Sequence, residues 1–525
     1  MTIPVRDLTS GGRMLLPTRP RLWTVVAPRD AANGRLDARL LIASNRLPLT
    51  VTDEGCGLTI QPSIGGLATG LRRVHERSGG KWIGWPGSTE HLDCVAQSEM
   101  MRQFEAQRVV PVTLSTSEER DLYDDIANGA LWPVFHDRLD LVSIEPNGWS
   151  AYESVNERFA DALAAEYRPG DIVWVHDYHL LRVPALLRDR IPDVRIGFFL
   201  HIPFPHWDLF STLPARRELL IGMLGADVIG FHTTSYRNNF AHTIDRVLGL
   251  PVITDGTVLR LTWEERSVQL GVHPMGIDAD AFEAQARSNP QSIMQTLEFR
   301  TNGMRSLLGV DRMDYSKGLT QRLLAFERLL ADNPRWRARV RLVQVAVPSR
   351  QRVAAYRRYR REVEALVSRI NGRFGTPTWT PVLHLHQSFP SEQLVALYRA
   401  ADVMLVTPLR DGMNLVAKEF VASRIDGDGI LILSEFAGAA EQLTDAIHIN
   451  PYDVRNVAAA MNTALTMPRA ERRLRMMRMR AHVHAQDVHW WANNFLRALT
   501  TAPVANGDDE YFERAGRVAL VVSNA

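Results

Sequence analysis

The feature that most constrains the fold of this chain is an alternation of short apolar runs with longer amphipathic runs, which starts near Arg39. Alternating strand-length and helix-length segments are typical of parallel sheets covered by helices on both faces. The pattern occurs twice, and an irregular stretch near 272–277 separates the two occurrences. The sequence predicts a first series of strands at 40–44, 172–176, 195–200 and 227–231, and a second at 304–310, 340–347, 382–386, 403–407, 429–434 and 446–450.

The repeated pattern predicts an α/β fold of two doubly wound, Rossmann-like domains that face each other across a central cleft. Amphipathic runs such as 319–331, 353–370 and 391–400 are the predicted helices of the second series. We expect an N-terminal domain at 39–275, a C-terminal domain at 276–484 and a tryptophan-rich helix at 485–500. This helix has to bury one face, which the N-terminal domain can provide. Residues 1–38 and 501–525 are predicted to be a flexible leader and a tail.

Length and charge narrow the class of protein. A chain of 525 residues is too long for one compact core, in agreement with two domains. The formal net charge of +2 argues against a dedicated nucleic-acid binder. No apolar stretch reaches membrane-spanning length, and the N-terminal residues lack the pattern of a secretory signal. The sequence therefore predicts a cytoplasmic protein without nucleic-acid or membrane partners.

The residues that bind metals or form disulfides are sparse. Cys56 and Cys94 are too few for a disulfide framework or a cysteine-rich zinc site. The pair His176 and His179 lacks a third clustered ligand. We therefore predict no metal site.

Polar clusters follow most of the predicted strands. In open parallel sheets, ligands bind beyond the carboxyl ends of the strands, so these clusters are candidates for a site. The segment at 408–415 also has a glycine that permits a tight turn before a predicted helix, and the free amide groups of a helix start favour an anion. The clusters lie at 44–46, 65–67, 176–179, 201–205, 311–318, 348–350 and 408–415.

Two pairs of basic residues in these clusters suit phosphates. Arg312 and Lys317 lie five residues apart across a predicted turn, and such a pair suits a diphosphate whose charge grows as a bond to it breaks. Arg46 and Arg350 follow strands of opposite halves, and two guanidinium groups closing on one phosphate monoester would explain both. Glu419 could accept hydrogen bonds from ribose hydroxyls. The alternatives are surface ion pairs for the first pair and a domain-interface salt bridge for the second.

Four aromatic residues are candidates for sugar contacts. Trp82 and Trp85 could stack on sugar faces, but burial in the core is the commoner fate of tryptophan and is expected for Trp82. Tyr123 and Trp132 leave the same two alternatives.

Eight specific motifs occur in a fixed order along the chain. They are S-N-R-L-P, G-G-L-x-x-G-L, W-x-G-W-P-G, L-W-P-x-F-H, W-V-H-D-Y-H-L, F-F-L-H-I-P-F-P, D-R-M-D-Y-S-K-G-L and T-P-L-R-D-G-M-N-L-V-A-K-E-F. In these motifs the chain resembles the trehalose-6-phosphate synthase family of retaining glycosyltransferases, which have the GT-B fold of two Rossmann-like domains. The similarity extends from about Leu40 to Leu499. One departure is at 125–128, where the family usually has a Gly-Phe-Ser-Asn-like stretch.

The resemblance implies transfer of glucose from a nucleotide-glucose to glucose-6-phosphate with retention, which gives α,α-trehalose 6-phosphate in trehalose biosynthesis. UDP-glucose is the default donor by resemblance, and GDP-glucose and ADP-glucose stay open. No cofactor and no metal are implied, since fixed cations would neutralise the leaving diphosphate. A separate trehalose-6-phosphate phosphatase would act on the product, and a homo-oligomer stays open.

The family pattern, carried over onto the matching positions, also implies a role for each site residue. The acceptor would contact Arg46, Trp85, Tyr123, Trp132, Asp177 and Arg350. The donor would contact Gly66, His201, Arg312, Lys317, Asp411, Gly412, Met413, Asn414, Leu415 and Glu419. The catalytic group would comprise Asp177, His201, Arg312, Lys317 and Asp411.

Three other functions stay open. A related synthase could use another acceptor phosphate, such as glycerol-3-phosphate, although the Ser-Asn-Arg, double-glycine and Tyr-His-Leu segments favour glucose-6-phosphate. A catalytically silent sugar-nucleotide sensor would normally have lost charged site residues, and none is missing here. A pyridoxal-phosphate phosphorylase needs a Schiff-base lysine. Of the three lysines in the chain, Lys317 and Lys418 already fall in motifs assigned to phosphate contacts.

Overall fold

The computed structural model describes residues 38–53, 58–62, 66–90, 92–144, 148–255, 258–288 and 303–502. All of them belong to the unit of the chain that begins at Ala38. The predicted leader lies outside the described residues apart from Ala38, and the predicted tail lies outside them apart from Thr501 and Ala502. Within these residues, no helix is long and apolar enough to cross a membrane.

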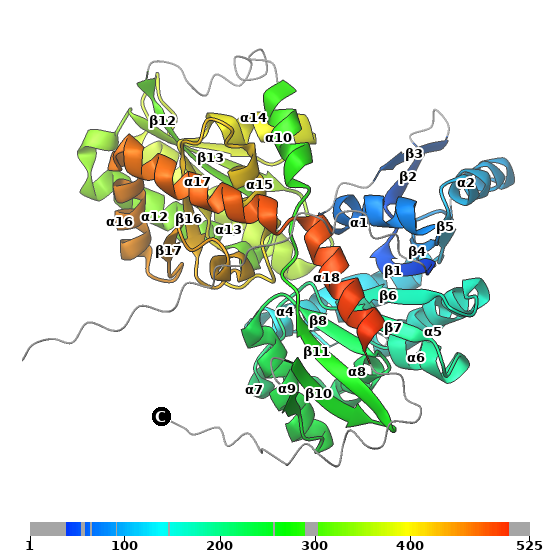
Figure 1. Cartoon of the computed structure of the whole chain (residues 1–525). Coiled ribbons are helices and arrows are strands. Elements are labelled where there is room, and N and C mark those ends of the chain that lie inside the picture. Colours follow the sequence, from blue (N-terminus) through cyan, green and yellow to red (C-terminus); the bar gives the residue numbers. More distant parts are fainter. Residues whose placement is uncertain are drawn as a thin grey trace, which may run out of the picture. The chain divides into compact units, whose positions relative to one another are not determined.

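The first half of the chain builds a sheet of nine strands (Figure 1). They are β1 (Leu40–Arg46), β4 (Trp82–Trp85), β5 (Val109–Pro111), β6 (Ile172–His176), β7 (Arg195–Phe199), β8 (Val228–Phe231), β9 (Ile253–Asp255), β10 (Val258–Trp263) and β11 (Arg266–Val272). Their order is β5-β4-β1-β6-β7-β8-β11-β10-β9. Neighbours pair in parallel from β5 to β11, and β10 and β9 add an antiparallel edge. All residues of β6 and β8 are buried, as expected for central strands of a parallel sheet.

Helices connect these strands, and their ends carry ordinary capping signals. The Thr233 hydroxyl accepts a hydrogen bond from the Tyr236 amide at the start of α9, which ends at Gly249 in the left-handed conformation. The longer helices are α1 (Gly66–Ser78), α2 (Cys94–Ala106), α5 (Gly148–Glu166), α6 (Val183–Arg190), α8 (Arg216–Leu224) and α9 (Thr234–Leu248). Shorter elements are the hairpin of β2 (Leu49–Asp53) and β3 (Leu58–Pro62), α3 (Thr116–Glu118), the π-helix η1 (Glu119–Leu131), α4 (Trp132–Phe135), η2 (Leu139–Leu141), η3 (Tyr178–Leu180) and α7 (Trp207–Phe210).

The second half builds a fully parallel sheet of six strands in the order β14-β13-β12-β15-β16-β17. The strands are β12 (Arg305–Arg312), β13 (Val340–Val347), β14 (Val382–Leu385), β15 (Val403–Val406), β16 (Ile430–Ser434) and β17 (Ile447–Ile449). The accompanying helices are α10 (Ala279–Ser288), α12 (Leu319–Asp332), α13 (Ala354–Phe374), α14 (Ser391–Ala400), α15 (Leu415–Ser423), α16 (Val454–Thr466), α17 (Arg469–Ala485) and α18 (Val488–Thr501), with short turns at η5 (Tyr315–Lys317), η6 (Pro334–Trp336) and η7 (Gly438–Glu441).

Both sheets reverse their strand order at one place. In the second sheet, the chain first adds β13 and β14 on one side of β12, and then β15, β16 and β17 on the other side. In the first sheet, β4 and β5 lie on one side of β1, and β6, β7 and β8 follow on the other side. The reversal points are therefore between β1 and β6 and between β12 and β15. In open α/β sheets, ligands bind at such points, beyond the carboxyl ends of the strands.

The predicted α/β fold with two parallel sheets is confirmed, and each of the predicted strands is present. The sequence reading missed the hairpin of β2 and β3, the short strands β4 and β5, and the antiparallel edge β9–β11. Strands of three or four residues show too little alternation to be recognised, and β4 also follows two glycines that read as a turn.

The chain passes between the two halves twice, first between β11 and α10 and again between α17 and α18. A Cβ on Gly276 would lie 2.3 Å from the backbone of Asp487, so only glycine fits where the two passages touch. The Val488 amide also donates a hydrogen bond to the Ile277 carbonyl at 3.0 Å. The two passages therefore lie side by side.

After the second passage, α18 returns to the first sheet and runs beside β7 and β8 (Figure 1). Phe495 stacks on Trp174 of β6 with 4.7 Å between ring centroids. A Cβ on Gly197 of β7 would lie 2.6 Å from the Phe495 ring, so this glycine leaves room for the helix. Arg195 fixes the end of α18 by donating to the Leu499 carbonyl at 2.8 Å.

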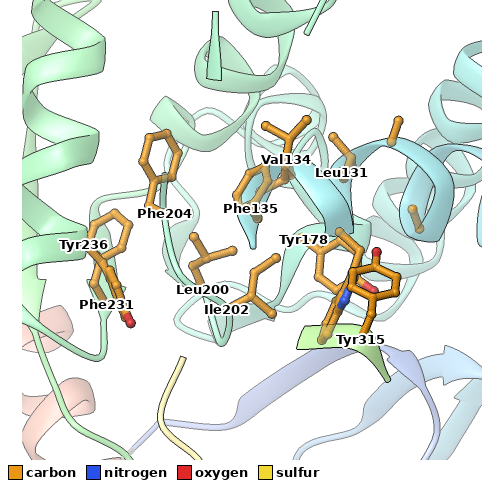
Figure 2. Packing of buried hydrophobic residues seen from close by; sticks show 14 of the residues in the cluster. Leu131, Val134, Phe135, Tyr178, Leu200, Ile202, Phe204, Phe231, Tyr236 and Tyr315 are labelled. Carbon is orange, nitrogen blue, oxygen red and sulfur yellow. The ribbon is translucent and has the colours of Figure 1, made fainter. Parts of the chain in front are cut away.

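Apolar packing extends from the first half into the second. One cluster of buried residues contains Phe135 and Phe204 of the first half, whose rings meet edge to face at 5.6 Å, and also Tyr315 of the second half. Figure 2 shows Tyr315 among the side chains of this cluster. Tyr315 lies in η5, shortly after β12, so the core continues up to the edge at which β12 carries its polar residues.

Lys418 of α15 connects the two passages. Its side chain is 1% exposed, and its ammonium donates to the Met275 carbonyl at 2.6 Å and to Oε1 of Gln442 at 2.5 Å. Gln442 in turn donates to Oε1 of Gln486 at 2.6 Å. Met275 belongs to the first passage and Gln486 to the second. Burial lowers the pKa of Lys418 to about 7.

We expect the substitution Lys418→Met to change how stability depends on pH. The unfolded lysine titrates near 10.5 and the folded one near 7, so unfolding takes up a proton between these values and wild-type stability rises with pH through this window. From pH 7 to pH 9, the wild type should gain about 2 kcal/mol of unfolding free energy relative to Lys418→Met in denaturant titrations.

Lys81→Met is the matched control for this prediction. Lys81 forms an ion pair with Glu166 at 2.7 Å and remains 33% exposed. The difference between the wild type and Lys81→Met should stay constant over the same pH range. A constant difference for Lys418→Met as well would contradict the prediction.

Candidate active site

The first part of the candidate site lies where β1 and β6 end. Asp177 follows β6 and has a φ of 73°, which is rare for a residue other than glycine and is typical of functional sites. Its Oδ1 accepts a hydrogen bond from the His201 amide at 3.2 Å, and its own amide donates to the Phe199 carbonyl at 2.8 Å. Burial raises the pKa of Asp177 to about 6. The backbone therefore fixes this carboxyl group at the edge of the first sheet.

Arg46 ends β1 and rests on aromatic rings. Its guanidinium lies 3.8 Å from the centroid of the Trp85 ring and 5.9 Å from that of Tyr123. Tyr123 in turn stacks on His179 with 5.9 Å between ring centroids. Cation–π contacts of this kind hold a guanidinium in place without neutralising its charge.

The two tryptophans of β4 are both 1% exposed. Trp82 donates its indole N–H to Oγ of Ser44 at 2.7 Å, in agreement with the expected core position. The guanidinium of Arg46 lies over the Trp85 ring, 3.8 Å from its centroid. Trp85 therefore positions Arg46 in this structure.

The second part of the site lies where β12 and β15 end. Arg312 is the last residue of β12, and Lys317 follows in the next turn. The Lys317 ammonium lies 2.6 Å from Oδ2 of Asp411, which comes after β15. Burial alone would raise the pKa of Asp411, but Lys317 beside it holds this pKa below its ordinary value. The Asp411 carbonyl accepts a hydrogen bond from the Tyr236 hydroxyl of the first half at 2.8 Å.

The start of α15 lies beside the Lys317–Asp411 pair. Asn414 precedes this helix with a φ of 69° and makes no side-chain cap. Its side-chain amide donates instead to Oδ2 of Asp411 at 2.9 Å. The first amide groups of α15, beginning with Leu415, have no partners within the helix, and together with the helix dipole they favour an anion.

Two close contacts join the parts of the site. A Cβ on Gly412 would lie 2.0 Å from the His201 carbonyl oxygen, and one on Gly66 would lie 2.6 Å from Cδ1 of Leu415. Gly412 and Leu415 belong to the second half, whereas His201 and Gly66 belong to the first. Glycine is therefore required at 412, where the other half presents backbone, whereas the atom that faces Gly66 is the end of the Leu415 side chain.

Arg350 follows β13 and is held from several sides. It has a φ of 46° and forms a buried ion pair with Asp314 at 2.8 Å. Its guanidinium lies 3.8 Å from the Trp132 ring centroid, and it donates to the hydroxyl groups of Tyr356 and, at 3.4 Å, Tyr178. Burial would raise the pKa of Asp314, but the Arg350 guanidinium beside it holds this pKa well below the usual range.

The four predicted cations differ in how their charges are balanced. Lys317 and Arg350 each face a carboxylate. Within the described part of the chain, neither Arg46 nor Arg312 forms an ion pair. Arg312 is exposed and lies 5.1 Å from the centroid of the Trp132 ring, which Arg350 also contacts. Arg46 and Arg350 rest on different rings, but both lie near His179: burial lowers the pKa of this histidine, and the charges of Arg350 and Arg46 lower it further.

His201 and Met413 lie close to these contacts. His201 is half-buried, and burial lowers the pKa of its ring to about 3. Met413 is 3% exposed, and its carbonyl accepts a hydrogen bond from the Ala439 amide at 2.9 Å. Both therefore contribute shape and neutral polar groups rather than charge.

Glu419 hydrogen-bonds to a residue outside the predicted site. Its Oε2 accepts a hydrogen bond from the Tyr398 hydroxyl at 2.9 Å, and burial raises its pKa. Among the described residues, none of the other predicted site residues forms a hydrogen bond or ion pair with Glu419.

The sequence departure at 125–128 lies in the π-helix η1. Asn128 is 1% exposed, donates to the Tyr123 carbonyl at 2.6 Å and accepts from the Tyr178 hydroxyl at 3.0 Å. Ile126 packs into the buried cluster that extends across both halves. The asparagine of this stretch thus connects two side chains near the cations, and the isoleucine fills core space.

Sequence reasoning missed the groups that position the arginines. Asp314, Tyr178 and Tyr356 were not predicted as site residues, although the first two lie inside the motifs quoted above. A carboxylate two residues after Arg312 was the available signal for Asp314. No comparable signal pointed to Tyr356 in α13.

Metal binding was not predicted from the sequence, and the residues that the structure describes contain no group of three or more His, Cys, Asp or Glu side chains arranged to hold a metal ion. The positive charge of this site comes from side chains and from a helix start.

A family comparison covers nearly all of the described chain. Glycosyltransferase family 20 matches residues 38–501. The chain belongs to glycosyltransferase family 20. This membership agrees with a site in which cations surround two neighbouring reversal points of parallel sheets.

Curated relatives within family 20 are similar over most of this chain. The trehalose-6-phosphate synthase of Mycolicibacterium vanbaalenii is 42% identical over 92% of this chain and 100% of its own length. The bifunctional trehalose-6-phosphate synthase/phosphatase of Thermoproteus tenax is 40% identical over 90% of this chain. This chain spans 65% of that relative's length.

Solved structures of similar proteins also match. One from Burkholderia xenovorans, an alpha,alpha-trehalose-phosphate synthase (UDP-forming) in complex with glucose-6-phosphate, is 34% identical with a TM-score of 0.79, over 88% of this chain and 100% of that one. One from E. coli, bound with UDP-2-fluoro glucose, is 37% identical with a TM-score of 0.79, over 88% and 99%. The fold class predicted from the sequence is confirmed by these matches.

We expect Asp314→Asn to destabilise this family 20 protein strongly. The substitution leaves the buried Arg350 guanidinium without its counter-charge, and breaking a buried pair from one side costs about 3–5 kcal/mol. Denaturant unfolding followed by tryptophan fluorescence would measure the loss.

Asp140→Asn provides the matched control, because Asp140 pairs with Arg138 at 2.7 Å but is 62% exposed. An exposed pair contributes about 1 kcal/mol or less. Equal losses of unfolding free energy in the two variants would show that the buried Arg350–Asp314 pair stabilises the protein no more than an exposed pair does.

Proposed function

We propose that this chain transfers glucose from UDP-glucose to glucose-6-phosphate and forms α,α-trehalose 6-phosphate with retention at the donor carbon. The observation that carries this proposal is the distribution of cations. Arg312 and Lys317 adjoin an uncapped helix start at one reversal point, and Arg46 adjoins the other. Two phosphates, one on each substrate, would account for both groups. The relatives named above are trehalose-6-phosphate synthases, in agreement with this assignment.

In this proposal, the second half holds the donor. Arg312, Lys317 and the first amides of α15 would bind the diphosphate, and Asp411 would accept hydrogen bonds from glucose hydroxyls. Lys317 faces Asp411 in the structure, so a diphosphate would share the ammonium with this carboxylate. Glu419 would bind the ribose, where its present partner Tyr398 would have to share it.

The donor would be enclosed by the segments at which the two halves touch. Gly66 and His201 come from the first half, and the backbone from 412 to 415 comes from the second. A Cβ at Gly412 would collide with the backbone of the opposite half, so the enclosure requires this glycine, whereas a Cβ at Gly66 would press only on the Leu415 side chain.

The first half holds the acceptor in this proposal. Arg46 and Arg350 would bind its phosphate, and Tyr123 and Trp132 would flank it. Asp177 would accept hydrogen bonds from sugar hydroxyls. Trp85 would act through Arg46, on whose guanidinium it stacks, rather than through a sugar. We assign acceptor binding to residues 39–275 and nucleotide-sugar binding to residues 276–484, with Arg350 reaching from the second region.

The reaction would proceed on one face of the donor sugar. The bond from the anomeric carbon to the diphosphate oxygen breaks, the acceptor hydroxyl oxygen bonds to that carbon from the same side, and its proton passes to the departing diphosphate. Arg312, Lys317 and the helix start would stabilise the growing negative charge, each by about 3 kcal/mol in analogy to oxyanion-stabilising groups. Fixed cations would thus supply the charge that a metal ion supplies in other enzymes, so we propose no cofactor.

Other aspects of the proposal concern the cell. Two cysteines in 525 residues suit a reducing compartment, so we propose a cytoplasmic enzyme. The product would be dephosphorylated by a separate trehalose-6-phosphate phosphatase, an activity that the Thermoproteus tenax relative carries in its name.

The test of this function offers glucose-6-phosphate together with UDP-, GDP- or ADP-glucose and identifies the disaccharide phosphate by mass and NMR spectroscopy. We expect α,α-trehalose 6-phosphate and UDP. Binding of a nucleotide-glucose without release of the nucleoside diphosphate would instead indicate a sensor. Product from glycerol-3-phosphate alone would indicate the related synthase.

We expect Lys317→Ala to lower turnover at least tenfold, because it removes a charge that stabilises the leaving diphosphate. Steady-state kinetics with saturating substrates would measure this. Lys81→Ala removes a lysine that pairs with Glu166 away from the site and should leave turnover unchanged. Unchanged turnover in Lys317→Ala would exclude Lys317 from this role.

We expect Arg46→Ala to raise the KM for glucose-6-phosphate at least tenfold and to spare the KM for the donor, because Arg46 would contact only the acceptor phosphate. The preference for glucose-6-phosphate over glucose should fall by the same factor. Arg102→Ala serves as control, since Arg102 pairs with Glu99 on an exposed helix. An equal loss of donor and acceptor affinity would contradict the assignment.

A further inference from the structure

Two histidines share a hydrogen bond that the reaction proposed above does not use. His176 ends β6 and is fully buried, whereas His201 follows β7 and is half-buried. Nδ1 of His176 lies 3.1 Å from Nε2 of His201. In a hydrogen bond between two neutral imidazoles, one ring donates and the other accepts. The direction of this bond therefore determines which nitrogen of His201 carries its proton.

Both rings are neutral at physiological pH. Burial lowers the pKa of His176 well below its ordinary value and that of His201 to about 3. Each ring therefore has one N–H group and one lone pair. This leaves two arrangements, in which either His176 or His201 is the donor.

The surroundings of His176 select one arrangement. Its Nε2 is buried and has no hydrogen-bond partner among the described residues. The ring packs against Trp174 and Trp491, with centroids 4.6 and 6.4 Å away, and an indole N–H can donate but cannot accept. Among backbone groups, a buried N–H without an acceptor is rarer than a buried acceptor without a donor, and we apply the same preference to this imidazole. Nε2 therefore carries the lone pair, and the proton of His176 is on Nδ1.

His176 then donates from Nδ1 to Nε2 of His201. Since Nε2 of His201 accepts this bond, the proton of the neutral His201 ring is on its Nδ1. His232, whose ring centroid is 5.6 Å from that of His201, does not compete, because its Nδ1 accepts from the Met275 amide at 3.4 Å and its side chain hydrogen-bonds the backbone of His201, not the ring.

We propose that His176 is a positioning residue that fixes the tautomer of His201, so that His201 offers an N–H donor to an oxygen of the transferred sugar. The sugar contact rests on the proposed function, whereas the tautomer does not. Without His176, the ring of His201 could present a lone pair at the same nitrogen. A hydroxyl oxygen that loses an N–H donor loses a hydrogen bond of modest strength, and about tenfold in affinity corresponds to this.

The tautomer is measured by NMR on the full-length, ligand-free protein labelled with ¹⁵N at histidine. Long-range correlations between the ring nitrogens and carbon-bound protons distinguish Nδ1–H from Nε2–H, and the His201 signals are those that vanish in His201→Gln. We expect the Nδ1–H form for His176 and His201. An Nε2–H form of His201 would overturn the proposal. This result stands whether or not the protein makes a disaccharide.

Three variants test the role in the reaction. His176→Phe removes the donor, and we expect a mixed or reversed His201 tautomer and a decrease of about tenfold in kcat/KM for the nucleotide-glucose, with the acceptor KM unchanged. His176→Asn retains a side-chain N–H and should largely restore the His201 tautomer and the kcat/KM for the nucleotide-glucose. His273→Phe is the matched control, because His273 is also a buried histidine, packs against Phe495 and has no hydrogen bond from its ring to any described residue.

The outcomes separate the proposal from a purely structural role. If His176→Phe keeps both the His201 tautomer and the donor kcat/KM, the proposal is wrong. If His176→Phe and His273→Phe lower activity equally while the His201 tautomer stays unchanged, His176 only fills space. If neither His176 variant folds, the wild-type spectrum alone decides. Absence of product with every nucleotide-glucose would refute the proposed function and leave the tautomer result in place.

Discussion

The reversal of strand order in each sheet is the constraint on which the site depends. Strands on the two sides of β1, and on the two sides of β12, leave a place at the carboxyl edge that no connecting helix covers. Arg46 and Asp177 flank this place in the first sheet. Arg312 and Asp411 flank it in the second. The chemistry of the site therefore follows from topology before any individual side chain is considered.

Charge balance then distinguishes the cations. Lys317 and Arg350 are buried and paired with carboxylates, as buried charges require. Arg312 is exposed and rests on an aromatic ring instead, as Arg46 does. Stacking orients a guanidinium and leaves its hydrogen-bond donors available to an incoming anion. The paired cations supply a fixed potential, and the stacked ones supply open donors.

Much of this arrangement could be predicted from the sequence, since parallel strands are continuous apolar runs and place the residues after them at one edge. The predicted strands and the positions of Lys317 and Asp411 illustrate this. Contacts between segments distant in sequence could not be predicted. Nothing in the sequence indicated that Arg46 covers Trp85, or that Tyr356 would contact Arg350. The π-helix η1 also could not be predicted, because its sequence has no simple periodicity.

The contact between the two passages also limits how the halves can move. Gly276 and Asp487 touch, and Lys418 reaches both passages, so any rotation of one half against the other has its axis near these residues. In such a rotation, the displacement of an atom grows with its distance from the axis. Segments close to the axis would barely move, whereas segments far from it would move furthest. A side chain added at Gly276 would therefore misalign the parts of the two halves that lie furthest from the axis.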